Sequence, residues 1–306
     1  MSPLADPVQG AHSSEGLGVL RIAGDDARAF LQGQLSNDVR QLTRENSQLA
    51  ALNTPQGRVV ALLRLIERAD GIHALLPASM IPTVIERLRK YVLRSKVTLA
   101  PAELAVQPIL GGIGAEPARS PPAGTTQGTA AHREAEGVSV LRVGGSSTRA
   151  LLVGPREGID TLMAREQLAA ADWNFWRLAQ IAAGEPQVYP ATAEHFVAQM
   201  LNLDLIGGLS FNKGCYTGQE IIVRTQHLGR IKRRMVRARY AGAPASPGDK
   251  LFEGEATAGE IVDAASRAGG TTEVLAVIQL AHAAGALHFA GAPLSVLNLP
   301  YPVETE

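Results

Sequence analysis

The sequence contains only one cysteine, Cys215, among its 306 residues. An internal disulfide is therefore impossible. One thiol also cannot hold an iron–sulfur cluster or a structural zinc ion, which usually need about four protein ligands. The seven histidines are scattered without the spacing of metal ligands. The composition thus predicts no resident metal ion, and it favours a reducing compartment, the cytoplasm.

Long apolar runs and net charge are also missing. No stretch reaches the roughly 18 apolar residues that a membrane span needs. Residues 1–18, which include Asp6 and Glu15, are not typical of a signal peptide or an anchor. The 29 basic residues balance 29 acidic ones, so the chain as a whole has no strong attraction to nucleic acid or to a membrane surface. Any electrostatic specialisation must be local.

The sequence does have an ordinary globular composition, with 45% hydrophobic residues and enough length for two or three packed units. Residues 111–137 are rich in Gly, Ala, Pro, Ser and Thr and are expected to form a flexible loop. Beyond Tyr240, short strands separated by Gly and Pro predict a small all-β module. Elsewhere the apolar spacing predicts helices over 25–33, 79–92, 156–170 and 173–183, and strands over 48–52, 58–66, 72–76, 138–143 and 150–153.

The segment 213–220, Lys-Gly-Cys-Tyr-Thr-Gly-Gln-Glu, is the most informative part of the chain. Thr217 and Glu220 have the spacing of a capping box, in which the hydroxyl accepts the N3 amide and the carboxylate reaches back to the N-cap amide. A helix from about Gly218 to His227 is therefore expected, with Thr217 as its N-cap.

Cys215 would then lie two residues before the N-cap, beside the positive end of a helix and two residues from Lys213. Both features favour the thiolate, the form of cysteine that reacts or ligates. Gly214 and Gly218 leave room for close approach by a ligand or by another backbone. The alternative is that Cys215 is an inert buried thiol and that the glycines only shape the turn.

A run of positive charge follows, without any acidic residue inside it. It is either a solvated basic face or an anion site for carboxylates, a polyglutamate tail or a phosphate backbone. No aromatic residues are interleaved with it to stack on bases. Its members are Arg224, Arg230, Lys232, Arg233, Arg234, Arg237 and Arg239.

Segment 213–220, together with Arg224-Thr225, resembles the K-G-C-Y-x-G-Q-E-x-x-x-R-T signature of the YgfZ/GcvT family. Three further stretches resemble the family in the expected order. Phe30–Val39 is similar to its F-L-Q-G-Q-x-[ST]-x-D stretch, Asn53–Arg58 to its glycine turn, and Tyr91–Val97 to its Y-x-L-R-x-K-V helix end.

The resemblance implies an α+β fold, a GcvT-like ring of α+β subdomains around a central cleft with a small C-terminal β-barrel. The body would span 16–240 as two intertwined α+β subdomains, and the barrel 241–303. It also implies tetrahydrofolate or a derivative as ligand, and a role in maintaining or repairing iron–sulfur enzymes, including those that modify tRNA. Partners would be iron–sulfur client proteins and folate, with tRNA or RNA contact through the basic run.

The resemblance also assigns candidate residues. Cys215 becomes the candidate catalytic residue, as a reactive or ligand-binding thiol that Lys213 would tune. Arg224 or the basic strand would meet the folate carboxylates. The full set of folate-binding candidates is Lys213, Tyr216, Gln219, Arg224, Gln34, Asn37, Asn53 and Arg58.

Two departures from the family separate its branches. Aminomethyltransferases carry an acidic pair shortly after the glycine turn, where this sequence has Ala61 and Leu62, neither of which can transfer a proton. Ala182 stands where many relatives have a glutamate that grips the pterin in the transferases. The sequence therefore predicts a folate-binding accessory protein without aminomethyltransferase chemistry.

Two other functions stay open. A folate-dependent one-carbon transferase would need a carboxylate near the folate, for which Asp38, Asp204 and Glu220 are the candidates. An RNA-binding accessory protein would use the basic run over 224–239 and would bind with an affinity that falls steeply with salt.

Overall fold

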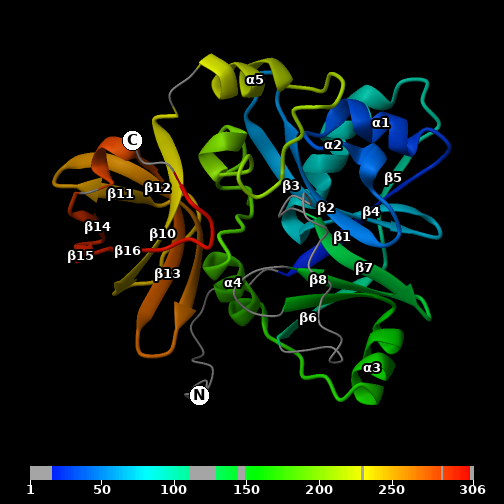
Figure 1. Ribbon diagram of the computed structural model, residues 1–306. Helices are drawn as coiled ribbons and strands as arrows, with labels where there is room; N and C mark the ends of the chain where they lie inside the picture. Colours follow the sequence, from blue (N-terminus) through cyan, green and yellow to red (C-terminus); the bar gives the residue numbers. More distant parts are fainter. Residues whose placement is uncertain (1–15, 111–128, 144–148, 229–230, 284, 304–306) are drawn as a thin grey trace.

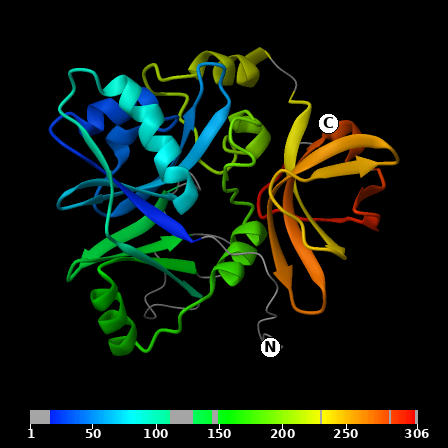
Figure 2. The ribbon, with the colours of Figure 1, turned by 180° about the vertical axis from the view of Figure 1, so that it is seen from behind.

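The computed structural model describes residues 16–110, 129–143, 149–228, 231–283 and 285–303. Two sheets form the two sides of the molecule, and helix α4 (Trp173–Ala182) lies between them (Figure 1). The view from behind shows the same arrangement, with the C-terminal sheet standing apart from the larger N-terminal part (Figure 2). In the described residues, no helix is long and apolar enough to cross a membrane.

The first sheet has nine strands in the order β5-β1-β4-β3-β2-β7-β8-β9-β6, all paired antiparallel. The strands are β1 (Leu17–Ala23), β2 (Asn46–Asn53), β3 (Val59–Arg68), β4 (Gly71–Pro77), β5 (Thr98–Pro101), β6 (Ala105–Leu110), β7 (Thr129–Ala135), β8 (Val138–Val143) and β9 (Arg149–Gly154).

This sheet cannot be flat. Its two edge strands, β5 and β6, are joined by residues 102–104 alone. Nine flat strands would be about 38 Å wide, whereas the link between these edges spans about 14 Å at most. The sheet therefore curls until its edges approach each other, and the backbone N–H of Ala102 donates to the carbonyl of Val19 in β1.

Helices α1 (Ala27–Gln34) and α2 (Ile81–Val92) cover one face of this sheet. Leu31, Val84 and Leu88 are fully buried, and they pack with residues of β1 to β4 in one hydrophobic core. The three- and four-residue spacing of buried positions in α2 is what an amphipathic helix requires. Helix α3 (Arg156–Arg165) packs on β8 and β9 through Ile159 and Leu162.

The second sheet has seven strands in the order β15-β14-β11-β12-β13-β10-β16. Only Leu294 separates β15 from β16, yet these strands lie at opposite edges, so the sheet closes almost completely into a barrel. The strands are β10 (Arg233–Ala241), β11 (Lys250–Glu253), β12 (Ala256–Arg267), β13 (Thr271–Gln279), β14 (Leu287–Phe289), β15 (Ala292–Pro293) and β16 (Ser295–Leu297).

One hydrophobic core joins the two sheets. It contains Leu62 of β3, Tyr216 and Ile222 of the signature region, and Leu275 of the barrel. Tyr301, near the C-terminal end of the described chain, is buried in the same core, and its hydroxyl donates to the carbonyl of Gly184 just beyond α4. The barrel is thus packed against the body by apolar contacts as well as by the chain connection. Short 3-10 turns complete the fold: η1 (Val39–Gln41), η2 (Ala78–Met80), η3 (Ala198–Leu201) and η4 (Leu280–His282).

The mixed α+β class and the C-terminal barrel are confirmed, and the predicted helices and strands are present. The predicted loop over 111–137 is wrong in its last part, because 129–135 pairs with β2 and β8 as strand β7, while 111–128 lies outside the described residues. Helix α3 ends at Arg165 rather than near residue 170, since Ala170 bridges to Ile109.

Two further expectations about the fold stay predictions. These are the arrangement of subdomains in a ring and the division into 16–240 and 241–303. Strand β10 (Arg233–Ala241) pairs with β13 and β16, so the C-terminal sheet takes in residues that precede the predicted division.

Candidate functional site

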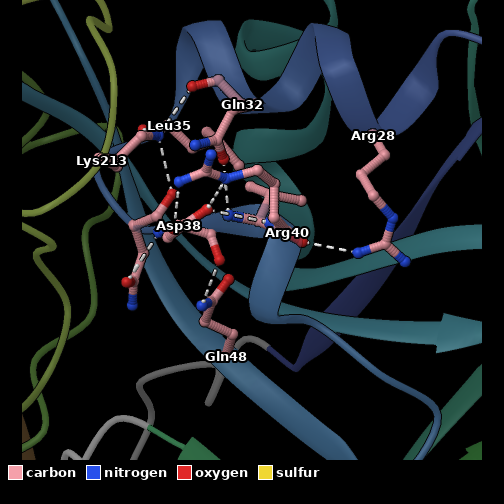
Figure 3. A network of polar contacts seen from close by, with 9 residues as sticks. Arg28, Gln32, Leu35, Asp38, Arg40, Gln48 and Lys213 are labelled. Atoms are coloured by element: carbon pink, nitrogen blue, oxygen red, sulfur yellow. Dashed lines mark hydrogen bonds and ion pairs between the residues drawn. The ribbon is translucent and has the colours of Figure 1, made fainter.

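Lys213 fastens the signature loop to the end of α1 and to the residues that follow it (Figure 3). Its ammonium donates to the carbonyl oxygens of Gln32, Leu35 and Asn37 at 2.7, 2.6 and 2.8 Å. Three acceptors match the three N–H bonds of an ammonium. Lys213 is only 7% exposed, and burial lowers its pKa to about 8. The ammonium also lies 4.9 Å from the ring centre of Tyr216.

The segment that receives Lys213 is itself fixed by side-chain bonds. The Asn37 amide donates to the carbonyls of Leu49 and Gly207, both at 2.8 Å, and accepts from the N–H of Asp38. The hydrogen-bonded Arg40 guanidinium lowers the pKa of the Asp38 carboxyl to about 2 (Figure 3). Asn37, a predicted folate ligand, is therefore fully engaged in holding the loop.

The glycine turn and the signature meet backbone to backbone. Gly218 has φ +82°, and a Cβ added there would lie 2.4 Å from the carbonyl oxygen of Thr54 and 3.0 Å from Cα of Gly57. Gly57 has φ +72°, and its added Cβ would lie 2.9 Å from Cβ of Ile221. A Cβ on Gly214, in contrast, would meet nothing within 4 Å. Of the two signature glycines, Gly218 therefore serves chain packing and Gly214 faces open space.

Cys215 lies on this anchored loop and is exposed, so the thiol is not buried. Helix α5 (Gln219–Leu228) begins one residue later than predicted. The position before it is Gly218, so the predicted Thr217 cap is wrong in register. The Thr217 hydroxyl instead bonds Gln34 Oε1 at 3.3 Å, which ties the signature to the end of α1.

Two buried polar atoms beside this loop have no hydrogen-bond partner in the described part of the chain. They are Oδ1 of Asn53 and the hydroxyl of Tyr216. Burial raises the pKa of Tyr216 to about 12, so its hydroxyl stays protonated at neutral pH. Because buried polar groups are almost always paired, such atoms mark places where a ligand can supply the partner.

The other predicted site residues are Arg58, Gln219 and Arg224. Arg58 is exposed and donates to the carbonyl of His195 at 2.6 Å. Gln219 is half-buried as the first residue of α5, and Arg224 is exposed further along it. Contacts thus tie Gln34 and Asn53 to the loop that carries Lys213, Cys215 and Tyr216, while Asn37 and Arg58 bond to the backbone of other segments.

The predicted basic run does not form one cationic face. Arg234 is buried, with a bidentate ion pair to Asp204 at 2.7 and 2.9 Å, and Arg237 pairs with Glu273 at 2.6 Å. Arg230 lies outside the described residues. The exposed members are Arg224, Lys232, Arg233 and Arg239.

One buried ion cluster could not be foreseen from the sequence. Asp263 of the barrel is fully buried, and its carboxylate lies 3.3 Å from Nε of Arg177 in α4 and 3.3 Å from the hydroxyl of Tyr189. Burial raises the pKa of Asp263 to about 6. Sequence spacing carries no signal for this cluster, because its members come from three separate segments.

Ala61 and Leu62, which stand where the sequence comparison above puts the acidic pair of the transferases, are both buried in hydrophobic cores. Neither can supply a carboxylate for one-carbon chemistry. Beyond Ala182, Glu185 forms ion pairs with Arg149 at 3.1 Å and with Arg64 at 3.8 Å. No group of three or more His, Cys, Asp or Glu side chains that could hold a metal ion occurs within the described ranges.

Comparisons with known proteins bear on the family and the fold. No family model matches the sequence. Proteins named tRNA-modifying protein YgfZ do match. The one from Colwellia psychrerythraea is 29% identical over 219 residues, or 71% of this chain and 68% of its own length. Those from Escherichia coli and Escherichia fergusonii are 30% and 31% identical over 220 and 224 residues, which cover 70% of this chain and 67% of each relative.

Among solved structures, the aminomethyltransferase T of the glycine cleavage system from Bartonella henselae superposes with a TM-score of 0.70, covering 94% of this chain and 84% of that protein at 15% identity. That likeness concerns the fold alone. With 30% identity over two thirds of the E. coli relative, this chain belongs to the family of the tRNA-modifying protein YgfZ, on the fold of the glycine-cleavage aminomethyltransferase.

Proposed function

We propose that this protein is a folate-binding accessory factor of tRNA modification that uses the Cys215 thiol to maintain or repair iron–sulfur enzymes. The observation that carries the proposal is the exposed Cys215 on a loop that Lys213 fastens to three backbone carbonyls. A thiol presented on a rigid loop can meet a protein-sized client. A single cysteine also cannot retain a cluster itself, which suits action on a client.

A one-carbon transferase is the weaker candidate because its carboxylates are otherwise engaged. Asp38 is paired with Arg40 and has a low pKa, so it is a poor general base at neutral pH. Asp204 is held by Arg234 in a buried ion pair. Glu220 is exposed in the first turn of α5, where a negative charge stabilises a helix.

Folate binding at this site is supported by the kinds of group that lie beside the loop. A pterin ring offers N–H donors and acceptors, which suit the unpartnered Asn53 Oδ1 and Tyr216 hydroxyl. The exposed Arg224 can bind the carboxylates of the folate tail. Open space at Gly214 leaves room for a ligand beside the thiol.

Two measurements test the proposal. The first is calorimetric titration with tetrahydrofolate, in which Arg224→Ala is expected to weaken binding and Cys215→Ala to leave it unchanged. The second is complementation of a strain that lacks its own YgfZ protein, read out as modified nucleosides in total tRNA by mass spectrometry. Cys215→Ala should fail to restore the nucleosides made by iron–sulfur enzymes, whereas the matched loop variant Ser210→Ala should restore them. Full restoration by Cys215→Ala would overturn the thiol role.

A further inference from the structure

The end of α2 displays two large apolar side chains to solvent. Leu93 is 88% exposed and Tyr91 is 42% exposed, and only two other large hydrophobic side chains in the described residues are exposed. An open hollow beside them is lined by Asp26, Tyr91, Leu93, Arg94 and Ser95. We call Tyr91, Leu93 and Arg94 the Leu93 patch. Neighbouring exposed apolar side chains of this kind often mark an interaction site.

Leu93 has a strained backbone conformation. Its φ of +42° and ψ of −105° lie outside the regions that an L-residue ordinarily adopts. The loop around it is fixed, because Ser95 N–H donates to the carbonyl of Val92 at 2.7 Å and Lys96 N–H donates to the Asp26 carboxylate at 2.7 Å. Strain of this kind persists only where the surroundings determine it, and it gathers at functional sites.

The charge around the patch is positive. Lys90 and Lys96 form exposed ion pairs with neighbouring acidic side chains, at 3.0 and 3.4 Å. Arg89 and Arg94 are exposed, with no ion pair among the residues that the structure describes. Glu86 and Asp25 are thus paired with lysines, and Asp26 accepts only the backbone N–H of Lys96. Two arginines without an ion pair against this one carboxylate leave the patch with a net positive charge, which attracts negative charge.

Helix α1 links the patch to the site. The Asp26 carboxylate at its start binds the Lys96 amide, and the carbonyls of Gln32 and Leu35 at its end bind Lys213. Its eight residues span about 12 Å. A protein seated on the Leu93 patch would therefore lie within one short helix of the loop that carries Cys215.

We propose that the Leu93 patch is a docking surface for an acidic segment of a protein partner, one that brings an aliphatic or aromatic side chain against Leu93 and Tyr91. A protein is favoured over RNA because Leu93, which is more exposed than Tyr91, is aliphatic and offers no face for base stacking. The identification of this partner with the iron–sulfur enzyme that Cys215 serves rests on the proposed function. The docking surface does not depend on the proposed function.

The test uses a fluorescein-labelled peptide of about twelve alternating Glu and Leu residues, a second peptide with Ser in place of Leu, and a labelled twelve-nucleotide single-stranded RNA. Binding to the full chain is followed by fluorescence anisotropy. We expect the Glu/Leu peptide to bind, and Leu93→Ser to weaken it at least about tenfold. The Ser peptide should bind the unaltered protein at least about tenfold more weakly. Val296→Ser, which removes another exposed apolar side chain, should change nothing.

Equal affinity for Leu93→Ser and the unaltered protein would overturn the docking surface. Equal affinity for the two peptides would also overturn it, as would RNA that displaces the peptide at equal or lower concentration. Because Leu93 contributes little to the core, Leu93→Ser should keep its melting temperature. The two proposals can fail separately. If the peptide binds and Cys215→Ala restores tRNA modification in full, only the thiol role is overturned. If the peptide does not bind and Cys215→Ala fails to restore tRNA modification, only the docking surface is overturned.

Discussion

The two glycines that flank Cys215 in the signature should respond very differently to alanine. Gly218→Ala places a methyl group at φ +82°, 2.4 Å from the carbonyl oxygen of Thr54. The left-handed backbone costs alanine about 1 kcal/mol, and the carbonyl must retreat by about 1 Å to restore an ordinary contact. That carbonyl also accepts the N–H of Gly57 at 2.9 Å, a bond worth about 1 kcal/mol.

Together these terms destabilise the Gly218→Ala variant by about 2 kcal/mol, which for a chain of 306 residues lowers the melting temperature by about 3 °C. Gly214→Ala meets nothing within 4 Å and has no positive φ, so its melting temperature should stay within about 1 °C of the unaltered protein. Thermal unfolding followed by circular dichroism gives both values directly.

A second readout separates packing from ligand approach. If a folate comes close to the open side of Gly214, the Gly214→Ala variant should bind tetrahydrofolate more weakly at an unchanged melting temperature. Gly218→Ala should raise the alkylation rate of Cys215 as the loop loosens. If the two variants melt within about 1 °C of each other, the close approach of Gly218 to Thr54 carries no energy and does not constrain the loop.

Three further variants test the buried charges by urea unfolding. Lys213→Met should cost about 3 kcal/mol or more, because three carbonyls lose a charged donor; a loss below about 1 kcal/mol would contradict the anchoring role. The pKa of Asp263 is about 6 in the fold against 3.8 for the free side chain, so its protonated form stabilises the protein below pH 4 and this contribution is lost as the pH rises through 6. The stability of the protein relative to its Asp263→Asn variant should therefore fall by about 3 kcal/mol between pH 4 and 7, and a flat difference would rule out a buried titrating carboxyl. Arg234→Met leaves Asp204 buried without its partner and should lower the free energy of unfolding by about 3 kcal/mol or more. Arg239→Met removes an exposed charge and should change the free energy of unfolding by no more than about 0.5 kcal/mol. Similar values for the two variants would indicate that both arginines lie on one solvated basic face.

The local elements could be predicted because their causes are local. The period of apolar residues in 81–92 gives α2, and Gly57 in a turn between two apolar runs gives the β2–β3 hairpin. The motif placed Lys213 and Cys215 on one segment, and their role as a site stays a prediction. Which partner each side chain takes could not be predicted, because it depends on segments far apart in sequence. Lys213 binds carbonyls 176 to 181 residues away.

The misjudged details have the same origin. Strand β7 was hidden because Thr129–Ala135 has Thr129 as its only β-branched or aromatic residue, and it becomes a strand by pairing with β2 and β8. The basic run looked like a surface because the sequence nearby holds no acid. The partners of Arg234 and Arg237 come from Asp204 and Glu273, which only the folded chain brings near.

The core shared by the two sheets has a consequence for how this chain can be cut or recombined. Met235 and Leu275 of the barrel pack with Leu62 and Tyr216 of the body, and Tyr301 returns to the same core. Expressed alone, the C-terminal barrel would turn these apolar side chains out to water and would tend to aggregate. The body expressed alone would expose the apolar side chains that pack against the barrel. The two halves should therefore melt in one cooperative transition and behave in evolution as a single exchangeable unit.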